Sequence, residues 1–245
     1  MLYIVGSPIG NLRDISLRAL EVLRQVNRVA AEDTRRIRIL LNHYEIEKPL
    51  LSYHEFNEAK RTAEIIQYLE QGESIALVSD AGMPCISDPG FRLITRCQQN
   101  QIPFTVIPGA SAVTTALVGS GLPTDRFYYG GFLPNKSGQR ERELRAALQR
   151  DCTSIYFESP YRLLKTLEAL NSLDPGCQIC VARELTKHFE EFRRGTVSEV
   201  RDHFAAHAPK GEITLVIASA TGTKELEKMA RRSSETAEEN SQGPF

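Results

Sequence analysis

The chain lacks both a long hydrophobic run and an excess of one charge. No stretch approaches about 18 consecutive apolar residues, so we expect no membrane-spanning helix. The first ten residues, MLYIVGSPIG, hold a short apolar run without a preceding basic segment, unlike a signal peptide. We therefore expect a cytoplasmic protein. The net charge of −1 gives no global positive field, so an RNA-binding role would require basic residues gathered on one face.

The cysteines form no recognisable framework. Five cysteines at irregular spacing argue against a set of disulfides. Cys177 and Cys180 make a single C-x-x-C pair, whereas a structural zinc site needs two further ligands. The segment CQICVA also has the composition of a buried strand, in which cysteine acts as a small apolar residue. We predict no metal site.

The first half of the chain alternates short apolar runs with helical patterns. We predict strands over 2–5, 29–31, 74–78 and 104–107, separated by helices that begin near Ser16, Thr34, Asn57, Gly90 and Ser111. Strands that alternate with helices favour parallel pairing through right-handed crossovers. The sequence therefore predicts an α/β domain built on a parallel sheet.

The pattern breaks at residues 119–125, where turn-forming residues gather. The second half predicts strands over 127–132, 153–157, 178–182, 189–194 and 213–218, with helices over 139–149, 161–170 and 198–207. We expect an N-terminal α/β domain over 1–120 and a mixed-sheet α/β domain over 121–220. Residues 221–245 contain almost no large apolar side chain and are expected to be disordered. The chain has no internal repeat and no heptad.

Ligands of open α/β sheets bind beyond the carboxyl ends of the strands, which directs attention to three loops. The first, over 6–11, is rich in small residues but lacks the Walker lysine and the G-x-G-x-x-G spacing. It allows a ligand to approach the backbone closely, or it is a plain strand-to-helix turn. The third, over 107–112, offers free backbone donors at a helix start, or a cap provided by Ser111.

The second loop, over 79–90, is the most informative segment. It is longer than a simple crossover requires and contains several glycines and prolines, which is typical of a functional loop. Asp80 could accept hydrogen bonds from ribose hydroxyls or an ammonium group. For Asp88, followed by Pro89, we favour the structural role of helix N-cap.

Charged residues follow several predicted strands, which is unusual where strands are buried on both faces. Arg35 and Arg36 could bind phosphates, whereas Asp33 could cap the next helix. In the second half, charged clusters begin at Glu158 and Arg183. Further basic residues form a ridge along the chain: Lys136, Arg140, Arg142, Arg145 and Arg150. Such a run of charge is also typical of an ordinary solvated helix face.

Nine segments occur together and in order: YIVGSPIGNLRDIS, AEDTRR, SYHEFNE, LVSDAGMPCISDPG, IPGASA, SGLPTDRFYYGGFLP, YFESPYR, ARELTKHFEE and KGEITLVI. Through them, over residues 2–218, the chain resembles the small-subunit ribosomal RNA 2′-O-cytidine methyltransferase branch of the tetrapyrrole methylase superfamily. The resemblance implies a two-domain α/β fold with a cofactor cleft between the domains. It also implies S-adenosylmethionine as methyl donor, a homodimer, and a decoding-centre cytidine of 16S rRNA as acceptor, presented within the small subunit.

The resemblance also implies site residues. The expected cofactor contacts are Ser7, Asp80, Ala81, Gly82, Pro84, Ser111, Ala112, Phe157, Ala182, Gly211 and Glu212. Phosphates of the RNA are expected to bind Arg35, Arg36, Arg162, Arg183 and Lys187. The proton acceptor stays open among Asp33, Glu158, Glu184 and Lys187. A lysine base would need its pKa lowered by burial or a nearby cation.

Four positions depart from the family pattern: Ser7 and Met83 replace Thr, Ala110 replaces Pro, and Tyr161 replaces His. Ser7 keeps a hydroxyl, whereas Met83 leaves only a thioether that could pack against the cofactor. The first loop reads GSPIGN rather than the G-x-G-P-G type of relatives that modify tetrapyrroles, which favours an RNA substrate. The alternatives are a methyltransferase for a small tetrapyrrole and a non-catalytic ribosome-binding module.

Overall fold

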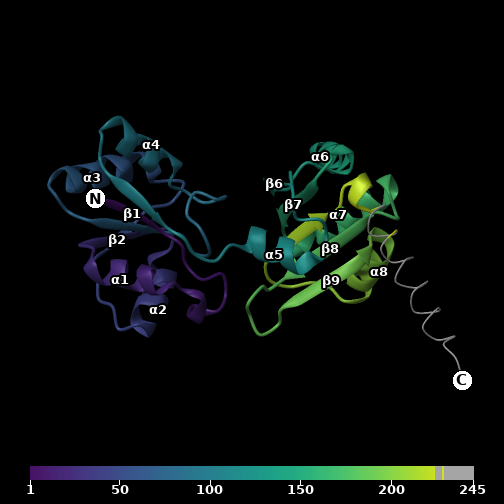
Figure 1. The fold of residues 1–245 in the computed structure, drawn as a ribbon, viewed down its shortest axis with the longest axis horizontal. Helices are drawn as coiled ribbons and strands as arrows, with labels where there is room; N and C mark the ends of the chain where they lie inside the picture. The colour runs from purple at the N-terminus through teal and green to yellow at the C-terminus, as the bar shows by residue number, and fades with distance from the viewer. Residues whose placement is uncertain (224–227, 229–245) are drawn as a thin grey trace, which may run out of the picture. The chain divides into compact units, whose positions relative to one another are not determined.

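The computed structural model describes residues 1–223 and 228, and the chain forms two compact units, Met1–Ala112 and Val113–Phe245 (Figure 1). Most of the predicted disordered segment, residues 221–245, lies outside the described residues. Each unit contains one five-stranded sheet, so the prediction of two α/β domains is confirmed.

The first sheet is parallel throughout, as predicted, and has the order β3-β2-β4-β1-β5. Its strands are β1 (Leu2–Val5), β2 (Arg28–Ala31), β3 (Leu50–Ser52), β4 (Ile75–Val78) and β5 (Phe104–Ile107). The sequence reading missed β3, which has only three residues, all of them half-buried. The other four strands begin within one residue of their predicted starts.

Helices cover both faces of this sheet. A short 3-10 helix η1 (Leu12–Asp14), α1 (Leu17–Gln25) and α2 (Thr34–His43) pack on one face, where Val5, Val29 and Val78 point. Helices α3 (Glu58–Glu70) and α4 (Phe91–Gln99) pack on the other, against Leu2 and Leu77. Residues that alternate along one strand therefore enter two different cores, which explains the continuous apolar runs.

Local signals placed most helix ends correctly. Ser16 caps α1 by accepting a hydrogen bond from the backbone of Ala19, and Asp33 caps α2 through Arg35. Gly72 has a φ of 88° just beyond α3, as expected of a glycine that ends a helix. The cap predicted at Asp88 is wrong: α4 begins at Phe91 with Gly90 in the cap position and no side-chain cap. Gly90 has a φ of 140°, a turn that leaves Asp88 outside the helix.

The second sheet is mixed, with the order β6-β7-β10-β8-β9. Its strands are β6 (Phe127–Phe132), β7 (Thr153–Glu158), β8 (Gln178–Arg183), β9 (Glu191–Thr196) and β10 (Ile213–Ile217), and the accompanying helices are α5 (Ala112–Ser120), α6 (Ser137–Gln149), α7 (Pro160–Leu173) and α8 (Val197–Ala206). Strands β6 and β7 are parallel, whereas β10 is antiparallel to both β7 and β8.

Helix α5 differs from its predicted place. The expected boundary at residues 120–121 put it in the first domain, but the chain from Val113 onward groups with the second unit. Gly119 explains the grouping, because Arg194 of β9 donates a hydrogen bond from Nε to its carbonyl at 2.9 Å. The ring of Phe192 also lies against Gly119, where a Cβ would clash.

Candidate functional site

Loops from separate parts of the chain meet at the carboxyl edge of the first sheet. Ser7 follows β1, and its backbone N–H donates to the carbonyl of Gly82, which follows β4, at 2.9 Å. The buried Ser7 hydroxyl also lies 3.1 Å from the carbonyl of Ser79. Two loops expected to contact the cofactor are therefore joined to each other, as the strand order β4-β1 requires.

Glycine makes this junction possible. A Cβ on Gly6 would lie 2.7 Å from the backbone of Gly109, which follows β5, and equally close to the sulfur of Met83. The Met83 thioether thus packs against the loop after β1, in place of any contact that a hydroxyl would make. Gly82 has a φ of 84°, which side-chain-bearing residues rarely adopt. These loops leave backbone, rather than large side chains, at the strand ends.

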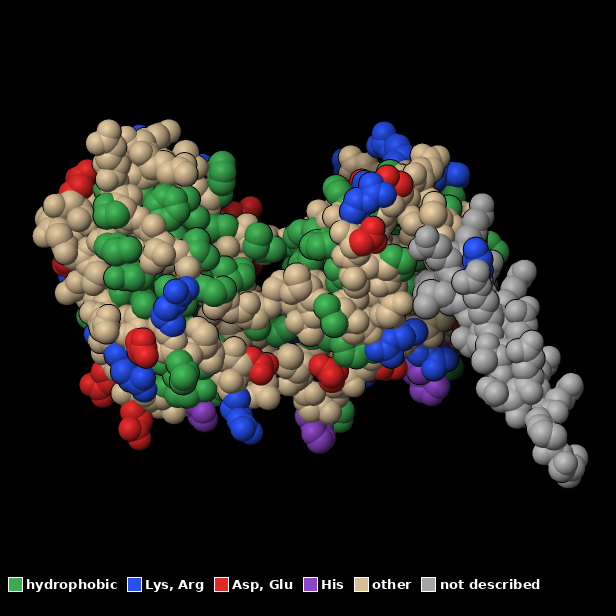
Figure 2. Space-filling model, in the orientation of Figure 1, with side chains coloured by type: hydrophobic (Ala, Val, Ile, Leu, Met, Phe, Trp, Pro, Cys, Tyr) green, Lys and Arg blue, Asp and Glu red, His purple; other side chains and the backbone are tan. Residues whose placement is uncertain are grey.

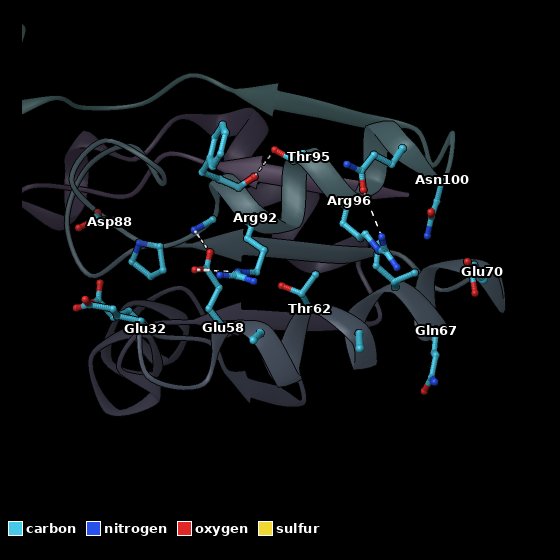
Figure 3. A pocket seen from close by; sticks show the side chains of 18 of the residues that line it. Glu32, Glu58, Thr62, Gln67, Glu70, Asp88, Arg92, Thr95, Arg96 and Asn100 are labelled. Atoms are coloured by element: carbon cyan, nitrogen blue, oxygen red, sulfur yellow. Dashed lines mark hydrogen bonds and ion pairs between the residues drawn. The ribbon is translucent and has the colours of Figure 1, made fainter.

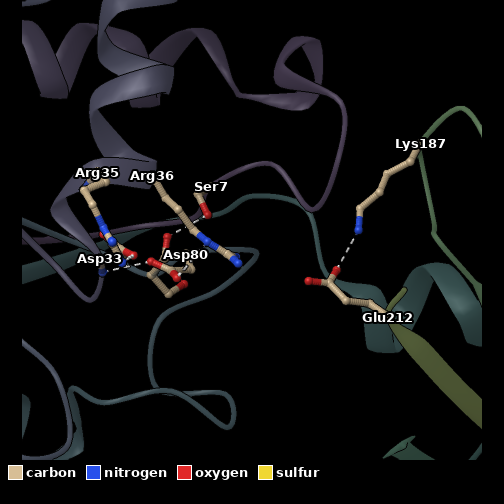
Figure 4. Close-up of polar contacts among 8 residues, drawn as sticks. Ser7, Asp33, Arg35, Arg36, Asp80, Lys187 and Glu212 are labelled. Atoms are coloured by element: carbon tan, nitrogen blue, oxygen red, sulfur yellow. Dashed lines mark hydrogen bonds and ion pairs between the residues drawn. The ribbon is translucent and has the colours of Figure 1, made fainter. Parts of the chain in front are cut away.

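Asp80 provides the charge at this edge. Its Oδ1 accepts the backbone N–H of Asp33 at 2.9 Å, and its Oδ2 lies 3.5 Å from Nε of Arg36 (Figure 4). The Asp33 carboxylate binds Arg35 through two side-chain hydrogen bonds of 3.0 and 2.6 Å. These hydrogen bonds hold the pKa of Asp33 far below its usual range. From the sequence, Asp33 could be either a helix N-cap or the proton acceptor, and in the structure it is the N-cap of α2.

Two further acids lie near Asp80. Burial, reinforced by the charge of Asp80, raises the pKa of Glu32. Burial also raises the pKa of Asp88 to about 6, with contributions from Glu32 and Asp80. The concentrated negative charge at this edge was not predicted, because Glu32 lies far in sequence from the loop that holds Asp80 and Asp88.

A groove of about 1070 Å³ runs between α3 and α4 and reaches Glu32 and Asp88 (Figure 3). Glu58 connects its two walls: its Oε1 accepts hydrogen bonds from the Tyr53 hydroxyl at 3.0 Å and from the backbone N–H of Gly90 at 3.2 Å. Arg92 lies 3.7 Å from its other oxygen. Glu58 therefore anchors the end of the 79–90 loop. The sequence did not indicate this role, because Gly90 lies 32 residues from Glu58 and Arg92 lies in the same distant segment.

In the second unit, the register gathers the predicted backbone contacts. Phe157 of β7 and Ala182 of β8 both pair with Thr214 of β10. Gly211 and Glu212 immediately precede β10 and therefore reach the same edge. Segments more than 50 residues apart thus form one row, as the proposed cofactor contacts require.

A salt-bridge cluster closes this edge. The ammonium of Lys187 lies 2.8 Å from Glu184. It also lies 3.0 Å from Glu212 (Figure 4). A Cβ on Gly211 would collide with the Glu184 carboxylate, which explains the glycine. Burial alone would lower the pKa of Lys187, but the hydrogen bonds to both carboxylates outweigh it and raise the pKa. Burial alone would raise the pKa of Glu184, but its hydrogen bond from Lys187 helps to lower that pKa overall.

The remaining strand-end charges are also paired within the protein. The buried Glu158 accepts hydrogen bonds from the hydroxyl of Thr166 at 2.6 Å and the backbone of Ser159 at 2.7 Å, and Arg162 lies 2.5 Å from its Oε1. Arg183 pairs with Glu191 at 2.9 Å. These charges thus brace the sheet edge.

The predicted basic ridge is interrupted. Arg140 is buried and donates to the carbonyls of Pro134 and Asn135, while Arg145 pairs with Glu141 at 2.7 Å. Arg150 pairs with Glu143 at 2.9 Å. On the face seen in Figure 2, basic and acidic side chains are interspersed. We therefore correct the expectation of a continuous basic surface along this ridge.

Cys177 and Cys180 are buried in the second unit, which confirms the strand interpretation of this segment. Burial raises the pKa of Cys177 to about 12 and that of Cys180 to about 11.

Within residues 1–223 and 228, no group of three or more His, Cys, Asp or Glu side chains is arranged to hold a metal ion. In the same part of the chain, no helix is long and apolar enough to cross a bilayer.

The chain is similar to known proteins over most of its length. The family model for Tetrapyrrole (Corrin/Porphyrin) Methylases matches residues 1–201. A protein of Thermotoga maritima called ribosomal RNA small subunit methyltransferase I is 48% identical over 88% of this chain and 97% of its own. The protein of that name from Bacillus subtilis is 44% identical over 89% of this chain and 74% of its own.

Solved structures share the fold at low identity. A diphthine synthase superposes with a TM-score of 0.71 at 17% identity, covering 89% of both chains. Uroporphyrin-III C-methyltransferase from Thermus thermophilus gives 0.62 at 21% identity, covering 89% of this chain and 93% of its own. A diphthine synthase and a uroporphyrin-III C-methyltransferase thus share this architecture.

Proposed function

The chain belongs to the tetrapyrrole methylase family, and we propose that it transfers a methyl group from S-adenosylmethionine to the ribose 2′-hydroxyl of a decoding-centre cytidine in 16S rRNA. The observation that carries the proposal is the 48% identity to a ribosomal RNA small subunit methyltransferase I across nearly that protein's whole length. The uroporphyrin-III methyltransferase reaches only 21% identity, which supports RNA over a tetrapyrrole as substrate. Fold alone does not separate the two substrates.

The first unit fits the cofactor by the character of its loops. Gly6 and Gly109 bring two backbones together, and the positive φ of Gly82 permits the tight turn in which its carbonyl accepts the Ser7 N–H. The Asp80 carboxylate can accept hydrogen bonds from a ligand. We assign the cofactor to Ser7, Asp80, Ala81, Gly82, Pro84, Ser111 and Ala112, and to the backbone near Phe157, Ala182, Gly211 and Glu212. The matched row of Phe157 and Ala182 supports the second set.

S-adenosylmethionine supplies an electrophilic methyl carbon, whose bond to sulfur breaks as the bond to the ribose 2′-oxygen forms. The hydroxyl proton must leave that oxygen. Among the four candidate bases, Asp33 and Glu184 have lowered pKa values, and Lys187 has a raised one. Glu158 is buried with its carboxylate already hydrogen-bonded. We therefore propose that the hydroxyl proton passes to solvent water, that alignment provides most of the catalysis, and that the Lys187 cation orients the acceptor.

Two arginines suit the phosphates of the RNA better than the others. The side chain of Arg35 is 87% exposed and that of Arg36 is 60% exposed, whereas those of Arg162 and Arg183 are largely buried in ion pairs. We propose that Arg35 and Arg36 bind phosphate, and that Arg162 and Arg183 contribute positive potential. We further propose a homodimer acting in the cytoplasm on 16S rRNA within the small subunit.

The test is mass mapping of ribose methylation in 16S rRNA from cells with and without the gene. We expect one cytidine to lose its 2′-O-methyl group when the gene is deleted, and to regain it when the gene is restored. An unchanged methylation pattern would refute the rRNA assignment. Calorimetry with S-adenosylmethionine separates an enzyme from a non-catalytic module, which would not bind it.

A further inference from the structure

Three large aromatic side chains face solvent at one edge of the second sheet. Phe132 ends β6 and is 60% exposed, Tyr161 follows β7 and is 93% exposed, and Phe189 follows β8 and is 68% exposed. Single exposed apolar residues are ordinary on a protein surface, but several at one edge indicate a binding surface. None of the three was assigned a role in cofactor or phosphate binding.

The strand register places their attachment points near one another. Glu158 at the end of β7 and Arg183 at the end of β8 both pair with Ile213, and Phe132 pairs with Phe157. With neighbouring strands about 4.8 Å apart, the ends of β7 and β8 are about 10 Å apart.

Two of the rings are held by their surroundings. Phe132 packs edge-on against Phe157, with ring centroids 5.4 Å apart. The Phe189 loop is closed by Glu190, whose carboxylate accepts the backbone N–H of Thr186 at 2.6 Å, and the ring of His188 lies 4.7 Å from that of Phe189. Aromatic rings held in this way lose little conformational entropy when they bind a flat partner.

Cations lie on the neighbouring segments. Lys136 follows β6 and Lys210 precedes β10, and both residues are exposed. Among the described residues neither ammonium group forms a salt bridge, in contrast to Lys187. Aromatic faces combined with unpaired cations are the composition that binds single-stranded nucleic acid, because bases stack while phosphates pair.

We infer that Phe132, Tyr161 and Phe189 form a base-stacking platform for unpaired nucleotides of an RNA substrate. This rests on the proposed function, which provides the RNA, and adds the surface that receives its bases. Tyr161, at a position where the family pattern has His, provides an aromatic ring on which a base can stack. Unpaired bases are the form in which proteins usually recognise RNA, because the A-form major groove is too narrow to read.

The experiment replaces Tyr161 and Phe189 with leucine, singly and together, and then with tryptophan. Leucine keeps an apolar side chain but removes the π face, whereas tryptophan keeps both. Phe127→Leu is the matched control, because Phe127 is also exposed but pairs with Thr153 at the opposite edge of the sheet. The measurements are affinity for a fluorescent single-stranded oligocytidine, KM and kcat with small ribosomal subunits, and the Kd of S-adenosylmethionine.

We expect each leucine variant to weaken oligonucleotide binding about tenfold, with tryptophan variants and Phe127→Leu near wild type. KM for subunits should rise, while the Kd of S-adenosylmethionine stays unchanged. Wild-type RNA affinity in the double leucine variant would overturn the platform. So would a change confined to oligomeric state, which would assign the rings to a second copy of the chain. If wild type binds the oligonucleotide through these rings but does not methylate rRNA, the proposed function fails and the platform stands.

Discussion

The two sheets end in different ways at the edges that carry the candidate site. At the first, glycines bring backbones together, and the Asp80 carboxylate receives the Asp33 N–H. At the second, Glu158 and Lys187 form internal ion pairs, and Tyr161 and Phe189 project into solvent. The first edge is suited to a small ligand that contacts backbone, and the second to a large partner with flat faces. Glu158 therefore stabilises the second edge through its internal partners rather than by contacting a ligand.

The largest effect tests the bracing at the second edge. Glu158→Ala removes a buried carboxylate and leaves the half-buried Arg162 and the buried Thr166 hydroxyl without their partner, so we expect stability to fall by about 3 kcal/mol or more. Thermal unfolding followed by circular dichroism measures it. Glu141→Ala is the control, because its pair with Arg145 is exposed and should change stability by less than about 0.5 kcal/mol. Equal losses in both variants would contradict the bracing role.

The first edge is tested by a pair of glycines with the same backbone conformation. Gly82 and Gly72 have φ values of 84° and 88°, so alanine at either should cost about 1 kcal/mol of stability. A Cβ on Gly82 would lie 3.3 Å from the Ile9 side chain, whereas a Cβ on Gly72 would have no neighbouring atom within 4 Å. We expect Gly82→Ala, and more so Gly82→Val, to weaken S-adenosylmethionine binding more than tenfold by calorimetry. Gly72→Ala should bind S-adenosylmethionine with normal affinity. Weaker binding in Gly72→Ala would show that backbone strain alone, and not contact with the pocket, lowers the affinity.

The carboxylate of the first edge comes next. Asp80→Ala removes the acceptor of the Asp33 N–H and the partner of Arg36, and we expect the Kd of S-adenosylmethionine to rise more than tenfold. The control is Asp125→Ala, because Asp125 is an exposed acid of the second unit. Unaltered affinity in Asp80→Ala would mean that this edge is not the cofactor pocket.

Two substitutions of Lys187 distinguish a general base from a cation that orients the acceptor. Its raised pKa predicts that it stays protonated, so Lys187→Arg should keep kcat within about threefold, while Lys187→Met should lose about tenfold. Steady-state methyl transfer at pH 7.5 measures both. Loss of activity in both variants, together with a wild-type rate that rises with pH through the lysine titration, would favour a base instead.

The smallest effect is the pH dependence from Asp88. Its folded pKa of about 6 exceeds the unfolded value, so the protonated form stabilises the fold at low pH. That contribution is lost as pH rises through 6. Asp88→Asn should therefore raise Tm by about 2–4 °C at pH 7.5, with the gain shrinking by pH 5. A gain independent of pH would show that Asp88 does not titrate in this range.

The sequence predicted the parts of the fold that depend on local patterns. The four longer strands of the first sheet are apolar runs, and Ser16 and Asp33 cap helices as their positions suggest. It failed where distant contacts decide the outcome. The φ of 140° at Gly90 displaced the expected cap from Asp88, and α5 joined the second unit through Arg194.

The site followed the same division. Loop composition directed attention to Gly82 and Asp80, whereas the partners of Glu58 come together only in the folded chain. One ion pair joins residues close in sequence, because Glu158 ends β7 and Arg162 lies four residues later in the first turn of α7. For Lys187 the sequence places one partner, Glu184, three residues away, whereas the other, Glu212, lies 25 residues away and meets it only in the folded chain.

The most direct measurement incubates the purified protein with methyl-labelled S-adenosylmethionine and small ribosomal subunits from cells that lack the gene. Mass spectrometry of the 16S rRNA then locates the label. The account predicts about one methyl group per subunit, on the 2′-oxygen of a single decoding-centre cytidine. No transfer to RNA despite cofactor binding, or transfer to a base atom, would contradict it.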